Sequence, residues 1–275
     1  APLLSSYAAW GVRSVVLFDR PNQRAQWPAP EWSRTGLVDR FLDTMLPVLQ
    51  SQQDAGLGPI LPPLEPGGDY WDTAFLAGIL EGLRRRGQDR LLEGLTLAVY
   101  AWTYGHSLDW GSGGPQAWPE AKPYHTPPGC QDQRGLRAFE WYAAVAAESG
   151  VPDLRLLVIA GGALRPDEAG SLGSDKHAED NLAIARALQN GQIPACIRNF
   201  AFYPLATEPG HPDAGSAWFE PPDAPRPVVE AMHRLVASPA AHSPSQPRLV
   251  PHYIWLNLDP AQLESSGLAA DRKST

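Results

Sequence analysis

The segment 64–72 (Leu-Glu-Pro-Gly-Gly-Asp-Tyr-Trp-Asp) combines an acidic side chain, a glycine-rich turn and two adjacent aromatic residues. The apolar run before it predicts a strand and the pattern after it predicts a helix, so Glu65 falls at the carboxyl end of the strand. A carboxyl group part-buried in an aromatic-walled cleft has a raised pKa and can act as a general acid. The competing interpretation is structural: Glu65 binds the amides of the turn, and Asp69 or Asp72 caps the helix. For Asp72 the sequence favours the cap.

Aromatic side chains gather in the stretches that follow the predicted strands. Their apolar faces can stack on sugar rings, and sites for small ligands are typically concave and lined by aromatic residues. Alternatively, long loops use tryptophan to fill small cores of their own, which is the favoured interpretation for any single tryptophan. At least one is nevertheless expected to face a ligand. The candidate ligand contacts are Asp69, Tyr70, Trp71, Tyr100, Trp102, His106, Trp110 and Trp218.

Short apolar runs alternate along the chain with amphipathic helical patterns. The runs that predict strands are 14–18, 57–64, 95–102, 154–159 and 195–205, and 252–258 is either one more strand or a packed extension. The helical patterns cover 37–54, 73–86, 136–149, 177–189 and 228–237. Such alternation predicts a mostly parallel sheet that is covered by helices.

Two architectures fit this alternation, a doubly wound open sheet and a (β/α)8 TIM-like barrel. No GxGxxG or GxxxxGK[ST] motif follows a strand, so the usual nucleotide signatures are absent. Strand-end residues followed by large loops favour the barrel. Because five strands are fewer than eight, and because the chain starts at Ala1 without an initiator methionine, we expect a barrel that lacks its first one or two units. We expect this domain over 1–237 and a Ser/Pro-rich linker with a C-terminal extension over 238–275.

Composition excludes several classes of protein. The net charge is −8, and the one basic run, 84–86, has acidic neighbours, so we expect no nucleic-acid partner. No stretch approaches the ~18 uncharged apolar residues of a membrane span, which predicts a soluble chain. The two cysteines, Cys130 and Cys196, fit neither a disulfide framework nor a metal clip, and we expect neither metal nor cofactor. The sequence leaves cellular location and oligomeric state open.

The pair Glu65-Pro66 after a strand, followed by Trp71 and a helix, resembles the Asn-Glu-Pro segment of retaining glycoside hydrolases with (β/α)8 barrels. The resemblance extends over roughly 14–237, as a likeness of order and spacing. The later elements that fall in the same order are the 95–102 strand with Tyr104 and His106, the 154–159 strand, and the 195–205 strand with Trp218 beyond it. It implies a carbohydrate ligand and Glu65 as the acid/base residue.

The sequence departs from that family where the nucleophile belongs. The resemblance implies a Glu at the end of the 154–159 strand, but the residues there are Val158-Ile159-Ala160-Gly161-Gly162-Ala163. Leu64 also replaces the Asn that usually binds the sugar 2-hydroxyl. Double displacement needs two carboxyl groups about 5–5.5 Å apart, and neither Ala nor Gly can attack the anomeric carbon.

Four hypotheses remain in view of this absence. An inverting enzyme would use a wider carboxyl pair, about 6.5–9.5 Å apart, to activate water. A barrel that binds saccharide or a protein partner without hydrolysis has the most weight, because losing an attacking group is simpler than replacing it. An enzyme of another class also fits, since fold alone does not choose the chemistry. In the remaining hypothesis the nucleophile comes from elsewhere, with the candidates Asp109, Asp167, Glu168 and Glu208.

Overall fold

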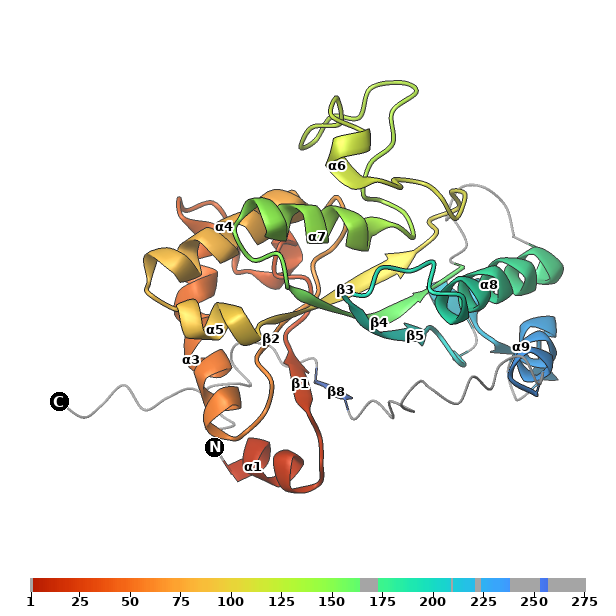
Figure 1. Ribbon diagram of the computed structural model, residues 1–275, viewed down its shortest axis with the longest axis horizontal. Coiled ribbons are helices and arrows are strands. Elements are labelled where there is room, and N and C mark those ends of the chain that lie inside the picture. The colour runs from red at the N-terminus through yellow and green to blue at the C-terminus, as the bar shows by residue number, and fades with distance from the viewer. Residues whose placement is uncertain (1, 164–172, 209, 221–223, 238–252, 257–275) are drawn as a thin grey trace.

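A four-stranded parallel sheet of order β2-β3-β4-β5 forms the centre of the molecule (Figure 1). The computed structural model describes residues 2–163, 173–208, 210–220, 224–237 and 253–256. The four strands are β2 (Ile60–Leu61), β3 (Thr96–Trp102), β4 (Arg155–Gly162) and β5 (Ile197–Phe202). Strands β3 and β4 pair over their whole length, so that Trp102 and Gly162 are partners at the carboxyl ends.

Strand β1 (Ser14–Leu17) is buried along its whole length and lies close to β2. It pairs in parallel with β8 (Tyr253–Leu256), from Ser14 with Tyr253 to Leu17 with Leu256. The run 252–258, which the sequence left undecided, therefore contains a strand. The remaining residues of the expected extension 238–275 lie outside the described residues.

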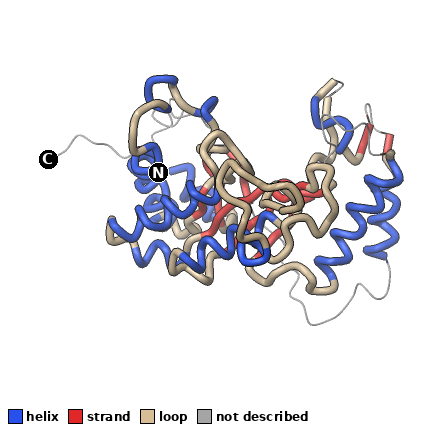
Figure 2. Tube along the Cα trace, turned by 90° about the horizontal axis from the view of Figure 1, so that it is seen from above, coloured by secondary structure: helices blue, strands red, loops and turns tan. Residues whose placement is uncertain are grey.

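Helices lie around the sheet (Figures 1 and 2), and α3, α4, α7 and α8 all contribute residues to the apolar core on one of its faces. One group lies near β2 and β3, and α8 and α9 form a separate pair whose helices run side by side. The longer helices are α1 (Pro2–Ala9), α3 (Leu37–Asp54), α4 (Asp72–Arg85), α5 (Asp89–Gly94), α7 (Ala138–Glu148), α8 (Ser174–Gln189) and α9 (Pro227–Ala237). The short elements are η1 (Arg24–Gln26), α2 (Ala29–Trp32), α6 (Gly114–Ala117), η2 (Pro212–Ser216), β6 (Phe219–Glu220) and β7 (Ala224–Pro225).

Strand β3 separates two apolar regions, because successive side chains of a strand point to opposite faces. Leu97, Val99 and Ala101 belong to the main core, which also takes in residues of α3, α4 and α7. On the other face, Ala98 packs with residues of β1, β2 and β4, and further along Tyr100 and Trp102 pack together. The second face therefore carries aromatic side chains to the carboxyl end of the sheet.

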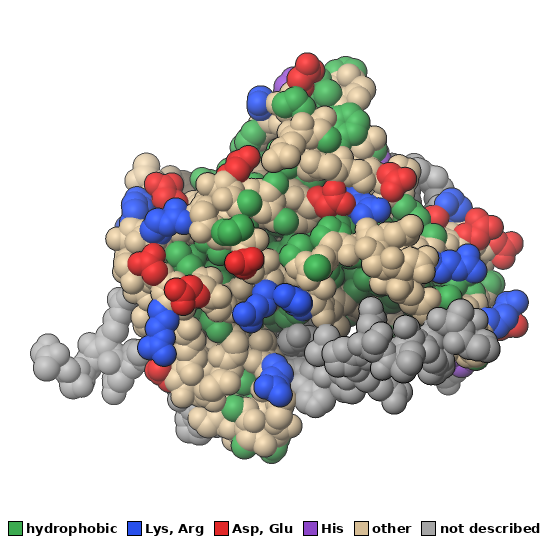
Figure 3. All heavy atoms as spheres, viewed as in Figure 1, with side chains coloured by type: hydrophobic (Ala, Val, Ile, Leu, Met, Phe, Trp, Pro, Cys, Tyr) green, Lys and Arg blue, Asp and Glu red, His purple; other side chains and the backbone are tan. Residues whose placement is uncertain are grey.

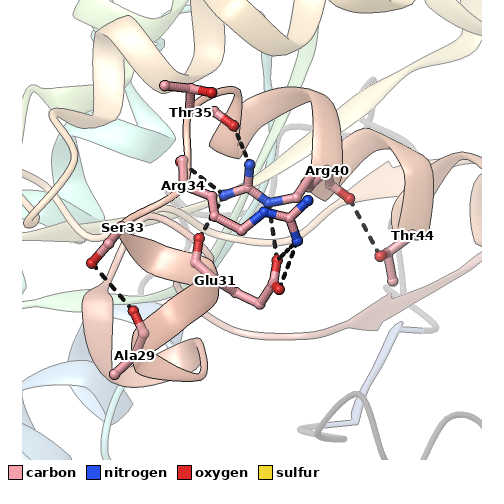
Figure 4. Close-up of polar contacts among 7 residues, drawn as sticks. All are labelled: Ala29, Glu31, Ser33, Arg34, Thr35, Arg40 and Thr44. Atoms are coloured by element: carbon pink, nitrogen blue, oxygen red, sulfur yellow. Dashed lines mark hydrogen bonds and ion pairs between the residues drawn. The ribbon is translucent and has the colours of Figure 1, made fainter.

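The junction of α2 and α3 is held by one arginine (Figure 4). Arg40 Nη2 donates to Glu31 O at 2.6 Å, and Arg40 Nε lies 3.3 Å from Glu31 Oε2. Arg34 Nη1 donates to the same carboxylate at 2.8 Å. The helix then runs for 18 residues through Pro47, whose carbonyl accepts the Ser51 hydroxyl at 2.8 Å. These contacts fix the start of α3, the helix that packs against α4.

The predicted alternation of strands and helices and the parallel sheet are confirmed. The order β2-β3-β4-β5 is sequential, unlike that of a doubly wound sheet, whose order reverses at a switch point. Closure into an eight-stranded barrel is not shown: within the described ranges the strands form sheets of four, two and two. The barrel therefore stays a prediction, as does the division of the chain at residue 237.

The surface seen in Figure 3 carries acidic and basic side chains that are interspersed and do not gather into one basic patch. In the part of the chain that the structure describes, no helix has both the length and the apolar character that crossing a membrane requires.

Candidate functional site

The turn that carries Glu65 is anchored by Asn22, a completely buried residue from the loop after β1. Its Nδ2 donates to Glu65 O and to Tyr70 O, both at 2.9 Å, and its Oδ1 accepts the Glu65 N–H at 2.8 Å. A Cβ atom on Gly68 would lie 2.5 Å from that amide nitrogen, so the turn requires glycine there. One side chain thus joins the loop after β1 to the loop after β2.

Asp72 fixes the same turn from the other side. It is the first residue of α4 and is completely buried, and the residue before the helix, Trp71, makes no side-chain cap bond. Asp72 Oδ1 accepts the Gly67 N–H at 2.9 Å and the Gln133 amide at 2.6 Å, and Oδ2 accepts the Tyr142 hydroxyl at 2.7 Å. Burial raises the pKa of Asp72, although these hydrogen bonds oppose the rise. The predicted helix cap is therefore wrong, because the side chain turns inward to three tertiary donors.

The carboxylate of Glu65 is paired with Arg20. Arg20 Nε lies 3.1 Å from Glu65 Oε2 and 3.6 Å from Asp19 Oδ2. Because both oxygens contact one nitrogen atom, they are at most about 6.7 Å apart, the sum of 3.1 and 3.6 Å. The Arg20 guanidinium carbon also lies 4.8 Å from the centroid of the Tyr100 ring. One cation thus contacts two carboxylates and an aromatic face.

Three aromatic residues of β3 and its following loop complete the group. Tyr100 donates its hydroxyl to Asp19 Oδ1 at 2.5 Å and stacks on Trp102, with centroids 4.7 Å apart and an interplanar angle of 11°. Trp102 meets Tyr104 edge-on at 5.9 Å and lies 6.5 Å from Tyr203. We call Asp19, Arg20, Glu65, Tyr100, Trp102 and Tyr104 the strand-end cluster.

Burial holds three groups of the cluster, Glu65, Tyr100 and Tyr104, toward their neutral forms. Burial raises the pKa of Glu65, and the neighbouring Asp19 and Asp72 add to the rise while Arg20 opposes it. Burial likewise raises the pKa values of Tyr100 and Tyr104, so both phenols are hydroxyl groups at neutral pH. Glu65 is consequently a better proton carrier than an exposed glutamate.

Four buried polar atoms of the strand-end cluster have no hydrogen-bond partner among the described residues: Arg20 Nε, Glu65 Oε2, Trp102 Nε1 and Tyr104 Oη. The first two form the ion pair described above, but not at a hydrogen-bonding angle. The large majority of buried polar side-chain atoms in proteins are hydrogen-bonded, so a concentration of exceptions needs an explanation. Together these atoms offer two N–H donors, a carboxylate acceptor and a hydroxyl.

A hollow of about 520 Å³ opens beside the cluster. The segment between β3 and α7, which includes α6, projects beyond the sheet and forms much of its wall (Figure 1). His106 and Trp110 stack there, with centroids 3.9 Å apart, and burial lowers the pKa of His106. The lining residues are Pro66, Tyr104, His106, Trp110, Thr126, Pro127, Pro128, Gly129, Cys130 and Arg134.

The structure brings together five of the sequence-predicted site residues. Glu65, Tyr100 and Trp102 belong to the strand-end cluster, and His106 and Trp110 line the hollow beside it. The two groups meet at Tyr104, which belongs to the cluster and also lines the hollow.

The other four predicted contacts lie elsewhere. Asp69 Oδ2 accepts the Arg24 N–H at 2.8 Å. Tyr70 packs edge-on against Phe75 of the main core at 5.3 Å. Trp71 is buried against Tyr124, and Trp218 lies against Phe202 beside α8 and α9.

At the end of β4, where the resemblance implies a nucleophile, the two glycines have close neighbours at the place of a side chain. A Cβ on Gly161 would lie 2.7 Å from the Ala101 carbonyl oxygen, and one on Gly162 would lie 2.7 Å from Asn181 Oδ1. Gly162 also has a φ of 126°, which side chains rarely tolerate. A carboxylate at either glycine is thus excluded by the packing of β4 between its neighbours.

Of the alternative nucleophile candidates, the two that the structure describes, Asp109 and Glu208, make no described contact with Glu65. Asp109 is exposed and pairs with Arg137 at 3.5 Å. Glu208 is exposed, and Asp167 and Glu168 lie outside the described residues.

The second carboxyl group of the site, Asp19, was missed by sequence reasoning. It follows the predicted strand 14–18 directly, so the strand-end position that drew attention to Glu65 was an equal signal for Asp19. Arg20 carried no such signal, because its partner is 45 positions away in the sequence. Tyr104 appeared only as part of the family resemblance.

The fold and site define a parallel α/β protein with a charged and aromatic cluster at its strand ends. No protein-family model matches the chain, and no curated protein matches it. Among solved structures, a GH128 (subgroup II) endo-β-1,3-glucanase from Sorangium cellulosum is similar with 14% identity and a TM-score of 0.47, over 80% of this chain and 69% of that chain. At that level of similarity, the function of the chain has to be argued from its own residues.

Proposed function

We propose that this chain binds a saccharide at the carboxyl ends of β1, β2 and β3 and does not hydrolyse it. The observation that carries the proposal is the group of four buried polar atoms in the strand-end cluster that make no hydrogen bond among the described residues. Sugar hydroxyl groups both donate and accept hydrogen bonds, so one ligand can satisfy donors and acceptors together. The parallel sheet in sequential order is compatible with part of a (β/α)8 barrel, whose ligand sites lie at this end of the strands.

Each side chain has a defined task in this proposal. Glu65 Oε2 accepts a hydroxyl, Trp102 Nε1 donates to another, and Tyr104 Oη does either. The stacked rings of His106 and Trp110 give the hollow an apolar wall for a further sugar unit. Asp69, Tyr70, Trp71 and Trp218 lie outside this arrangement and have no part in it.

The ion pair of Arg20 argues against hydrolysis. Its Nε contacts both Glu65 and Asp19, in the place where a sugar between the two carboxyl groups would have to sit. A guanidinium beside a carboxylate also stabilises the ionised form, whereas a general acid must carry the proton. With no carboxylate possible at Gly161 or Gly162, the chain offers binding groups and lacks the expected attacking group.

One observation favours hydrolysis as a second candidate. Glu65 has a raised pKa, and Asp19 is a second carboxyl group at most about 6.7 Å from it, by the two distances to Arg20. Carboxyl pairs about 5–5.5 Å apart serve retaining hydrolysis, and pairs about 6.5–9.5 Å apart serve inverting hydrolysis. This candidate requires Arg20 to leave the space between them when substrate binds.

Calorimetric titration against a panel of neutral oligosaccharides, with release of reducing ends measured in parallel, tests the proposal. We expect binding without release, and we expect Trp102→Phe, which keeps the ring but removes Nε1, to weaken binding by about tenfold, as loss of one good hydrogen bond does. Glu148→Gln on the exposed end of α7 is the matched control and should bind like the wild type. Release that stops in Glu65→Gln would establish the second candidate, and unchanged affinity in Trp102→Phe would contradict the proposed site.

A further inference from the structure

The strand-end cluster has more carboxylates than cations. Asp19 and Glu65 share the single guanidinium of Arg20. Tyr100 adds only a neutral hydroxyl, which donates to Asp19. Two negative charges are therefore set against one positive charge in a part-buried place.

Asp72, behind the Glu65 turn, adds a third carboxyl group. Its hydrogen-bond donors are the Gly67 amide, the Gln133 amide and the Tyr142 hydroxyl, all of them neutral. No described ion pair joins Asp72 to a cation. It is close enough to raise the pKa of Glu65 further.

The neighbouring hollow supplies no free positive charge. Arg134, which lines it, is bound to Asp132 through Nε and Nη2, with Nε at 2.8 Å from Oδ2. His106 is held toward its neutral form, and no lysine occurs among the described lining residues. No described lining residue of the hollow therefore offers a cation that could offset the negative charge of the cluster.

An uncompensated charge in a part-buried site is unfavourable, and there are two ways to relieve it. Glu65 can take up a proton, in which case it no longer offers a carboxylate to a ligand. Otherwise the ligand can bring a positive charge, for which the faces of Trp and Tyr are also favourable neighbours. A neutral sugar does neither, and an acidic sugar would be repelled.

We propose that the saccharide recognised by the strand-end cluster is an amino sugar, a hexosamine with a free ammonium group. This inference rests on the proposed binding function and names its ligand class. The ammonium group has N–H donors, and one of them fits Glu65 Oε2, which accepts no hydrogen bond among the described residues. The hydroxyl groups of the same sugar supply the hydrogen-bond partners that Trp102 Nε1 and Tyr104 Oη lack. The hollow lies where a following sugar unit would extend.

Three β-1,4-linked trisaccharides that differ only at carbon 2 test this ligand class. They are fully deacetylated chitotriose, which carries ammonium groups, N-acetylated chitotriose, and cellotriose, which carries hydroxyl groups. We measure their dissociation constants by titration calorimetry at a pH that keeps the amines protonated. The wild type is expected to bind the deacetylated form at least about tenfold more tightly than the other two.

Two variants test whether the preference for deacetylated chitotriose arises in the strand-end cluster. Glu65→Gln keeps the shape of the side chain but removes its charge, so the preference for the deacetylated form should fall to about threefold or less. Glu148→Gln, exposed on α7, removes the same charge from a remote surface and should leave the preference intact. An equal loss of preference in both variants would overturn the inference.

The chain has a net charge of −8 and could attract any cation. The experiment must therefore distinguish this general attraction from specific binding of a sugar. Trilysine serves as the cationic probe without a sugar ring. Binding of trilysine as tight as that of deacetylated chitotriose, and indifferent to Trp102→Phe, would overturn the inference. Equal affinity for all three trisaccharides would also overturn it but leave the proposed function standing, whereas no binding of any oligosaccharide contradicts both.

Discussion

Arg20 Nε lies 3.1 Å from Glu65 Oε2, an ion pair that joins the loop after β1 to the loop after β2. The same two loops are also joined by Asn22, through three hydrogen bonds to Glu65 and Tyr70. The backbone under Glu65 is therefore fixed independently of its side chain. Substitution of Glu65 should consequently change charge at the site without moving the turn, which makes the variants at this position interpretable.

Stability should depend on pH through Glu65. Its folded-state pKa is raised above the ordinary value of 4.5, so the folded protein holds this proton more tightly than the unfolded chain does. The contribution of Glu65 to stability is thus fully present below pH 4.5 and is lost as pH rises through the folded-state pKa. Urea unfolding across acidic to neutral pH should show a smaller decline in Glu65→Gln than in the wild type. Parallel curves for the two proteins would contradict the raised pKa, and Glu148→Gln should follow the wild type.

Asp72→Asn should destabilise the protein substantially. The substitution places an amide N–H₂ against donors that now bind a carboxylate oxygen, and a buried donor left without an acceptor costs about 1–3 kcal/mol. Urea unfolding measures the change. Tyr142→Phe removes one of the three donors, so the double variant should be less destabilised than the sum of the single ones. Strict additivity would mean that the Asp72–Tyr142 hydrogen bond contributes nothing.

How far the sequence alone leads is clear from particular segments. The helix over 37–54 was predicted with its observed bounds, because its apolar spacing and the glycine after it agree. The strand predicted over 57–64 shrinks to Ile60–Leu61, because Pro59, Pro62 and Pro63 have no N–H to donate to a sheet. The apolar pattern thus predicted a strand correctly, whereas the missing N–H groups of the prolines limited the length of that strand.

Some features of the candidate site likewise follow from local sequence, and others depend on tertiary structure. The place of Glu65 at a strand end follows from local pattern, whereas its nearness to the aromatic residues of β3 depends on the pairing of β2 with β3. Its pairing with Arg20 and the burial of Asp72 depend on loops brought together by the sheet, and no local pattern encodes them. An aspartate at a helix start has the same local pattern whether it caps the helix or turns inward, as Asp72 does.

Gly161→Ala should lower stability, since its Cβ would lie 2.7 Å from the Ala101 carbonyl oxygen within the paired strands. Overpacking of this kind typically costs about 1–3 kcal/mol, and Gly161→Glu should prevent folding. Gly94→Ala is the matched control, because the nearest atom to its added Cβ is 3.9 Å away. Thermal unfolding followed by circular dichroism compares the variants. A Gly161→Ala protein as stable as the wild type would contradict the close packing at this position of β4.

Arg20→Gln should strengthen the preference for a cationic sugar. Removal of the guanidinium leaves Asp19 and Glu65 without their shared cation, so a ligand ammonium becomes the one available partner for both. The pKa of Glu65 should also rise further, since Arg20 is the neighbour that lowers it. Carbon-13 NMR of the Glu65 carboxyl group measures the titration, and calorimetry with deacetylated chitotriose and cellotriose measures the preference. Arg24→Gln, whose side chain lies over Trp32 away from the cluster, is the control. A ratio of the two affinities that falls in Arg20→Gln would show that the arginine, and not the excess of carboxylates, determines the ligand.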